Sequence, residues 1–302
     1  MTMVNDGALL IEDLRLRLRD SFELRIDHLE IASNHRLAIV GHNGAGKSML
    51  LECIVGLTRP DSGNVIVGGR PVDAYNRNPK LRKTMGVQLQ RNNFPENASV
   101  RALVHLHRAA YGQQDADLAE GLDIRAIAGL TYGRLSKGEK QRIDMYMALA
   151  HRPPLAILDE PTAGLDATRA GRLAEILARP FVPAFCMASH REEEIAAATH
   201  LLCLRQGSVV AYGERDHVVA QSIGQYVLEL DFADQAAFGS VSTEVRRVPS
   251  VRLVHAEGLQ LRIYSDRPLD AEQAQLRGQA ESFRMGRSTL DDFLSVITRG
   301  DV

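Results

Sequence analysis

The segment GHNGAGKS at positions 41–48 constrains the chain most, because of what stands on either side of it. RLAIV before it has the apolar composition of a buried strand, and KSMLLECIVGL within and after it has a helical pattern. A G-x-x-x-x-G-K-S turn between a strand and a helix binds phosphate through curled backbone N–H groups and the positive end of the helix. A chance glycine-rich turn would not match eight residues in this context. The segment predicts an α/β fold with a nucleotide site.

Two residues at the end of this loop carry the chemistry that phosphate binding needs. Lys47 can reach the β- and γ-phosphates, and the hydroxyl of Ser48 can ligate Mg²⁺.

LAILDEP at 155–161 is a second apolar strand, and it ends in two acids. Asp159 is expected beside the loop, where it can hold Mg²⁺ through water, and Glu160 is expected to act as the general base toward water. Two acids at the end of a strand are often only exposed surface residues. Beside a phosphate loop, the same pair instead indicates Mg²⁺ binding and activation of water.

Composition and patterning indicate a globular protein with two domains. The chain has 302 residues, of which 45% are hydrophobic and 25% charged, and its net charge of −2 gives no reason to expect nucleic acid as a partner. Short strands alternate with helical stretches over 1–222, with a helical subdomain at about 91–150. Residues 223–302 change to strands, a turn at Glu257-Gly258 and helices, which predicts a smaller α+β domain.

Cysteine use and hydropathy favour a cytoplasmic location. Cys53, Cys186 and Cys203 are far apart, lie in apolar runs and lack metal-ligand spacing, so they are expected to be buried thiols. No apolar run approaches the length of a membrane span, and the N-terminal residues do not have the layout of a signal peptide. Contact with a membrane is therefore expected to require a partner.

YGRLSKGEKQR at 132–142 resembles the LSGGQ signature of ABC ATPases, and it precedes LAILDEP as it does in that family. The other motifs follow in family order. MGVQLQ resembles the Q-loop and places its glutamine at Gln90, TAGLD resembles the D-loop with Asp166, and MASH resembles the switch strand with His190. The resemblance covers 1–222 and implies a P-loop NTPase core of the ABC type.

This resemblance implies an ATPase that uses ATP and Mg²⁺ and works as a sandwich dimer. In such a dimer, Ser136, Gly138 and Glu139 of one subunit would close on the ATP of the other. Gln90 and His190 join Glu160 as the implied catalytic residues, Ser48, Gln90 and Asp159 would hold Mg²⁺, and Asp166 belongs at the interface. The implied ATP-binding residues are Gly41, Asn43, Gly44, Ala45, Gly46, Lys47, Ser48 and Met49.

Two departures from the family pattern stand out. The signature has Lys137 and Glu139 where the family usually has glycine and glutamine, so Lys137 brings an extra charge to the closing site. The aromatic residue that usually stacks on adenine has no clean match. Leu18 stands near its usual position, and the nearest aromatic, Phe22, is equally compatible with packing in the core.

The C-terminal part resembles the extension of ABC-2-type exporter ATPases. Its last helix, in STLDDFLSVITRG, is predicted to be capped by Ser288, and NNFPENASV is predicted to precede a helix that begins near Ser99. Phe94 is expected either in a groove for the permease's coupling helix or in the subdomain core. The implied partners are a second copy or a related ATPase subunit and a separate membrane permease, with no nucleic acid expected.

Four other functions compete with that of an exporter ATPase. An importer ATPase and an ATPase that regulates a non-transport membrane partner both stay open. A soluble DNA-repair ATPase is disfavoured because the segment between Lys47 and Ser136 is too short for a long coiled-coil insert. A translation factor would carry two ATPase modules and a basic linker, and this sequence has neither.

Overall fold

The computed structural model describes residues 7–18, 22–89, 94–112, 115–179, 184–269 and 279–299. The chain divides into two compact units, 1–212 and 213–302. The division falls before the boundary at 222/223 that the sequence suggested, because helix α10 (Arg215–Ile223) groups with the second unit, where it packs against α13 (Leu290–Arg299). Each unit is described by itself below.

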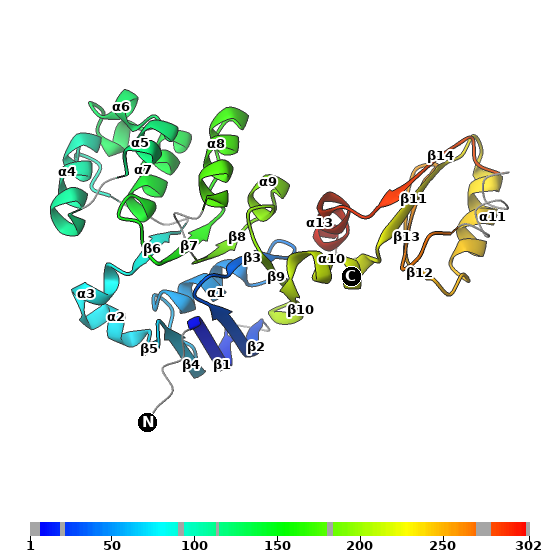
Figure 1. Ribbon diagram of the computed structural model, residues 1–302, viewed down its shortest axis with the longest axis horizontal. Coiled ribbons are helices and arrows are strands. Elements are labelled where there is room, and N and C mark those ends of the chain that lie inside the picture. Colours follow the sequence, from blue (N-terminus) through cyan, green and yellow to red (C-terminus); the bar gives the residue numbers. More distant parts are fainter. Residues whose placement is uncertain are drawn as a thin grey trace. The chain divides into compact units, whose positions relative to one another are not determined.

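The first unit is built on one mixed sheet of ten strands in the order β5-β4-β1-β2-β10-β9-β3-β8-β7-β6 (Figure 1). The run from β9 to β6 is parallel, and β1 pairs antiparallel with β2 and β4. The parallel strands are β3 (Arg36–Val40), β6 (Met85–Gln88), β7 (Leu155–Asp159), β8 (Ala184–Ala188) and β9 (His200–Arg205). The others are β1 (Gly7–Arg17), β2 (Glu23–Ala32), β4 (Ser62–Val67), β5 (Arg70–Pro71) and β10 (Ser208–Glu214).

The parallel strands have the burial that their sequences predict. Every residue of β7 and β8 is buried, as expected for strands covered on both faces, and these strands therefore appear in the sequence as continuous apolar runs. In β2, buried and exposed positions alternate for much of the strand, as expected where one face meets solvent. Helix α1 (Lys47–Ile54) packs against β7 and β8 and buries Leu50, Leu51, Cys53 and Ile54. The predicted α/β class is confirmed.

A helical segment follows β6, as predicted for residues 91–150 (Figure 1). Its longest helix, α7 (Lys137–Leu149), packs against β6, and α4 (Val100–Tyr111) packs against α7. The oxygen of Ser99 accepts a hydrogen bond from the backbone N–H of Ala102, so the predicted start of α4 is confirmed. The unit's remaining helices are α2 (Asp73–Arg77), α3 (Pro79–Arg82), α5 (Ala116–Gly121), α6 (Ile124–Ile127), α8 (Ala167–Ala178) and α9 (Glu192–Ile195).

The second unit contains an antiparallel sheet in the order β12-β13-β11-β14. Because β13 lies between β11 and β12, the segment β11–α11–β12 forms a split β-α-β unit. Helix α11 (Gln235–Val245) packs on this sheet through Val241 and Val245. The strands are β11 (Tyr226–Asp231), β12 (Val251–Glu257), β13 (Gln260–Ser265) and β14 (Ser282–Arg287).

Two details of the second unit differ from the sequence prediction. Strand β14 was not predicted, because all six of its residues are exposed and it lacks a buried apolar alternation. The cap of α13 was placed one residue too early. Thr289, not Ser288, exchanges hydrogen bonds with Asp292, whose carboxylate accepts from the Thr289 backbone N–H and hydroxyl.

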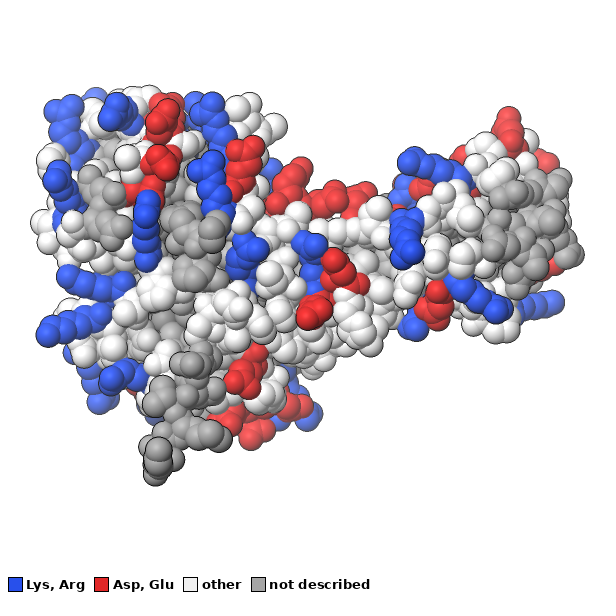
Figure 2. All heavy atoms as spheres, viewed as in Figure 1, with Lys and Arg blue, Asp and Glu red and all other residues white. Residues whose placement is uncertain are grey.

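The surface of the described residues mixes charges of both signs. Figure 2 shows Lys and Arg gathered over the helical segment of the first unit, with Asp and Glu among them. In the part of the chain that the structure describes, no helix has both the length and the apolar character needed to cross a bilayer.

Candidate active site

The phosphate loop, residues 41–46, joins the end of β3 to the start of α1. Its backbone geometry needs glycine at two positions in particular. Gly46 precedes α1 with a φ of 102°, and a Cβ on Gly41 would lie 2.2 Å from the carbonyl oxygen of Leu204. Among the described residues no side chain caps α1, so the first N–H groups of this helix are left for an acceptor outside the helix.

Lys47 lies folded along this loop. Its Nζ donates hydrogen bonds to the carbonyl oxygens of Gly41 at 2.7 Å and His42 at 3.1 Å. Burial lowers the pKa of Lys47, and the negative charges of Glu160 and Asp159 oppose that shift. The ammonium group therefore lies within the electrostatic influence of both acids that the sequence had assigned to the same site.

Asp159 ends β7 beneath the loop, with 3% of its surface exposed. Burial raises the pKa of its carboxyl group, while a hydrogen bond from Ser48 and the charge of Lys47 act in the opposite direction. A buried carboxylate beside a hydroxyl is an oxygen donor set of the kind that Mg²⁺ binds. Ser48 and Asp159 therefore fit the predicted magnesium site.

Glu160 takes a left-handed backbone conformation, with a φ of 49°. Such a conformation is costly for a residue with a side chain and is concentrated at functional sites. The backbone N–H of Glu160 donates to Ala188 at the end of β8, which holds the turn in place. The carboxylate Oε1 lies 3.6 Å from Nδ1 of His190, and these side chains are 28% and 57% exposed.

A cavity of about 350 Å³ brings Glu160 together with the predicted ATP-binding residues except Gly41 and Ala45, which do not line it. Phe22 and Leu18, the two candidates for adenine contact, both line it as well. The ring of Phe22 lies against the loop, with its Cζ 3.0 Å from where a Cβ on Gly46 would be, and it also packs on the apolar core of the unit. The cavity is lined by Leu18, Phe22, Asn43, Gly44, Gly46, Lys47, Ser48, Met49 and Glu160.

The signature segment, residues 135–139, forms the start of α7 and does not line this cavity. Ser136 and Glu139 form a reciprocal capping box, in which the Glu139 carboxylate accepts from the Ser136 backbone N–H and hydroxyl, each at 2.8 Å. A Cβ on Gly138 would lie 2.6 Å from the carbonyl oxygen of Gly164, so this position requires glycine. The signature therefore packs directly against the loop that follows Glu160.

Asp166 and Gln90 complete the predicted set. Asp166 caps α8 by accepting from the backbone N–H of Arg169 at 3.0 Å, and it forms an ion pair with the same arginine. It is exposed, as an interface residue of a monomer would be. Gln90 lies outside the described residues.

Three residues that the sequence analysis did not single out hold the site together. The Gln88 side chain accepts from the Asp159 backbone N–H at 3.1 Å, and Gln141 of α7 donates to the carbonyl oxygens of Glu160 and Pro161. Buried Glu194 accepts from the backbone N–H of Thr162 at 3.0 Å. Gln88 carried a usable signal, since it is a polar residue within an otherwise apolar strand. Gln141 and Glu194 stand in polar segments, where nothing marks them.

A glycine-rich phosphate loop, a buried aspartate at the end of another parallel strand of the same sheet and a glutamate one residue later define a P-loop ATPase. Comparison with known proteins narrows the class. Residues 24–163 match the family described as ABC transporter. Nod factor export ATP-binding protein I of Rhizobium sp. (strain N33) is 31% identical over 264 residues, which cover 83% of each chain. The chain belongs to the ABC transporter ATP-binding proteins and is an ATPase subunit of that family.

Other similar proteins carry different descriptions. Molybdenum import ATP-binding protein ModC of Pseudomonas aeruginosa is 32% identical over 242 residues, covering 75% of this chain and 65% of that protein. Among solved structures, one described as the ATP binding subunit of an ABC transporter has a TM-score of 0.61 at 23% identity, covering 71% of this chain and 92% of that chain. Relatives named for export and for import are thus both similar to this chain.

Proposed function

We infer that the chain powers export through a separate membrane permease. The observation that carries this proposal is the extent of the similarity to Nod factor export ATP-binding protein I, which spans 83% of both chains, whereas the iron and molybdenum import proteins cover 76% and 75% of this chain. Since the first unit ends at Tyr212, coverage of 83% extends well into the second unit. Import and regulation of a non-transport membrane protein are the competing functions.

In the proposed mechanism, each working site is shared between two copies or between this chain and a related subunit. Lys47 and the N–H groups of the phosphate loop hold the triphosphate of ATP. Ser48 and Gln90 would hold Mg²⁺ directly and Asp159 would hold it through water, and the ion would neutralise charge on the phosphates. Glu160 accepts a proton from the attacking water, and His190 orients Glu160 and contacts the γ-phosphate. Ser136, Gly138 and Glu139 of the partner close the site, with Asp166 at the interface.

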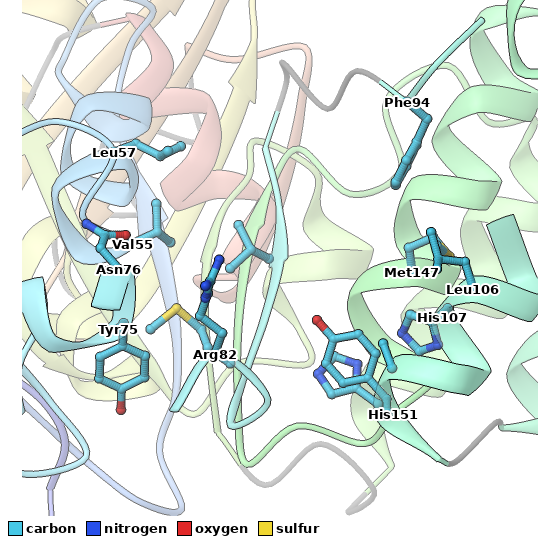
Figure 3. A pocket seen from close by; sticks show the side chains of 14 residues that line it. Val55, Leu57, Tyr75, Asn76, Arg82, Phe94, Leu106, His107, Met147 and His151 are labelled. Carbon is cyan, nitrogen blue, oxygen red and sulfur yellow. The ribbon is translucent and has the colours of Figure 1, made fainter. Parts of the chain in front are cut away.

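A groove within the first unit suits a docking helix of the permease. It has a volume of about 650 Å³, and its lining is mostly apolar, with Val55 and Leu57 on one wall and Phe94, Leu106 and Met147 on the other (Figure 3). Leu57 and Leu106 are 71% and 66% exposed, which is unusual for leucine and is typical of a binding surface. Phe94 lines this groove and also meets the ring of Tyr132 edge-on, a placement compatible with both of its predicted roles.

Membrane fractionation and transport in vesicles test this proposal. The tagged chain should co-purify from its native membranes with one integral protein, and Leu106→Asp should abolish that association, whereas Leu130→Asp, an exposed leucine that does not line the groove, should retain it. Inside-out vesicles that contain the complex should accumulate cargo when ATP is added. Loss of cargo from the vesicle lumen when ATP is added would show that the protein is an importer. ATPase activity with no transport by a co-purifying membrane protein would indicate the regulatory role.

A further inference from the structure

Lys137 is an exposed cation at a position where a helix normally disfavours one. It is the first residue of α7, and the structure gives it neither a hydrogen bond nor an ion pair among the described residues. A positive charge in the first turn opposes the helix dipole. The apolar part of its side chain passes Gly164, with Cγ 3.5 Å from where a Cβ on that glycine would be.

The nearest acid in the same helix turn is already engaged. The Ser136 backbone N–H and hydroxyl both donate to Oε2 of Glu139, which lowers the pKa of that carboxyl group. The Gly138 backbone lies against the Gly164 carbonyl, which fixes the start of α7 on the loop that follows Glu160. The stem of Lys137 therefore lies against Gly164, while its ammonium group has no anionic partner among the residues that the structure describes.

We propose that Lys137 binds the terminal phosphate of the ATP held by the partner subunit and thereby adds a cation to the composite site. This inference rests on the proposed sandwich dimer, in which the start of α7 faces the partner's phosphate loop. The ammonium group, the Ser136 hydroxyl and the Gly138 backbone N–H all lie at the start of α7, and the partner's phosphate would supply the negative charge that this helix start lacks. The lysine thus makes dimer closure depend on the γ-phosphate and on ionic strength.

The test compares ATP-driven dimerisation in a Glu160→Gln background, measured by analytical ultracentrifugation with MgATP. Lys137→Gly should raise the dimer dissociation constant by at least about tenfold, since a hydrogen bond to a charged group is lost at each of two sites. Lys137→Arg should restore tight dimers, and Lys80→Gln, which changes an exposed lysine on α3, should match the parent. The parent's dimerisation should weaken with salt more steeply than that of Lys137→Gly.

Binding of ADP separates this role from a structural one. ADP lacks the γ-phosphate, so Lys137→Gly should bind ADP as the parent does, and its circular dichroism should be unchanged. If the parent dimerises and Lys137→Gly dimerises equally well, the assignment of Lys137 is wrong while the sandwich stands. If the parent itself stays monomeric with MgATP, the sandwich and the assignment fall together.

Discussion

The Glu160 carboxylate and the His190 imidazole lie 3.6 Å apart, although 30 positions separate them in the chain. The sheet produces this closeness. Strands β7 and β8 are parallel neighbours in which Asp159 pairs with Ala188, so the residues that follow each strand leave the sheet at the same edge. The left-handed turn at Glu160 then directs its side chain into the cavity with Lys47. This pairing supports the proposed role of His190 as the residue that orients the base.

His190→Ala should lower the turnover number for ATP hydrolysis by at least about tenfold, because the Glu160 carboxylate loses the partner that orients it. The KM for ATP should change less, since Lys47 and the loop are intact. Steady-state phosphate release measures both constants. His217→Ala, which changes a histidine on α10, is the control, and equal turnover in both variants would contradict the role of His190.

Gly138→Ala should destabilise the protein and reduce ATPase activity, since its Cβ would be forced to within 2.6 Å of the Gly164 carbonyl oxygen. Gly171→Ala in α8 is the matched control. No heavy atom lies within 4 Å of the Cβ it would add, so it should stabilise the helix by about 0.5–1 kcal/mol. Chemical denaturation measures both changes, and destabilisation by Gly171→Ala or tolerance of Gly138→Ala would contradict the packing described here.

Glu139→Gln should keep the stability of α7, because glutamine can complete the same capping box with Ser136. Glu139→Ala removes the side-chain acceptor of the Ser136 backbone N–H and should lower the free energy of unfolding by about 0.5–1 kcal/mol. Urea denaturation of the two variants beside the parent gives this comparison. Equal losses in both variants would mean that the charge of Glu139, rather than the box geometry, stabilises the helix start.

His151 should make the protein less stable in acid. Burial lowers its pKa from the usual 6.5 to about 4, with a smaller effect from nearby His107. Because the folded-state pKa is below the unfolded value, the unfolded chain binds more protons, and the stability this histidine contributes above pH 6.5 is lost as the pH falls toward about 4. In His151→Phe, the midpoint of thermal unfolding should therefore change less with pH between these two values.

The control for this pH series is His105→Phe, because His105 is exposed on α4 and its replacement should leave the acid-side slope as it is in the parent. Thermal midpoints should be recorded for all three proteins across the same range. An unchanged slope in His151→Phe would show that other groups govern the acid sensitivity.

The parts of the fold that the sequence predicted share a strong local signal. RLAIV, LAILD and AFCMA are continuous apolar runs, so their burial in a parallel sheet followed from their composition. Strand β14 gave no such signal, because an exposed edge strand needs only a neighbour to pair with, and β11 supplies one. Thr289 was passed over for Ser288 because both residues can cap a helix and only the backbone geometry decides between them.

The candidate site likewise contains residues that could be predicted from the sequence and residues that could not. The phosphate loop, Asp159 and Glu160 could be placed from sequence because their chemistry needs fixed residue types at fixed spacing in one short segment. Gln88 and Gln141 act through contacts with other segments of the chain. Gln88 is 71 positions from Asp159, and Gln141 is 19 positions from Glu160, so no local sequence pattern encodes these contacts. Phe22 illustrates a third case, since a ring that both lines the cavity and packs on the core fits two predictions at once.

Phosphate release by Glu160→Gln, measured beside its binding of ATP, tests whether Glu160 is the general base for ATP hydrolysis. Glutamine keeps the size and hydrogen bonding of the side chain but cannot accept a proton from water. The account predicts ATP binding close to that of the parent, hydrolysis reduced by at least about a hundredfold, and an ATP-bound dimer that persists. Hydrolysis at the parent's rate would contradict the assignment of Glu160 as the general base.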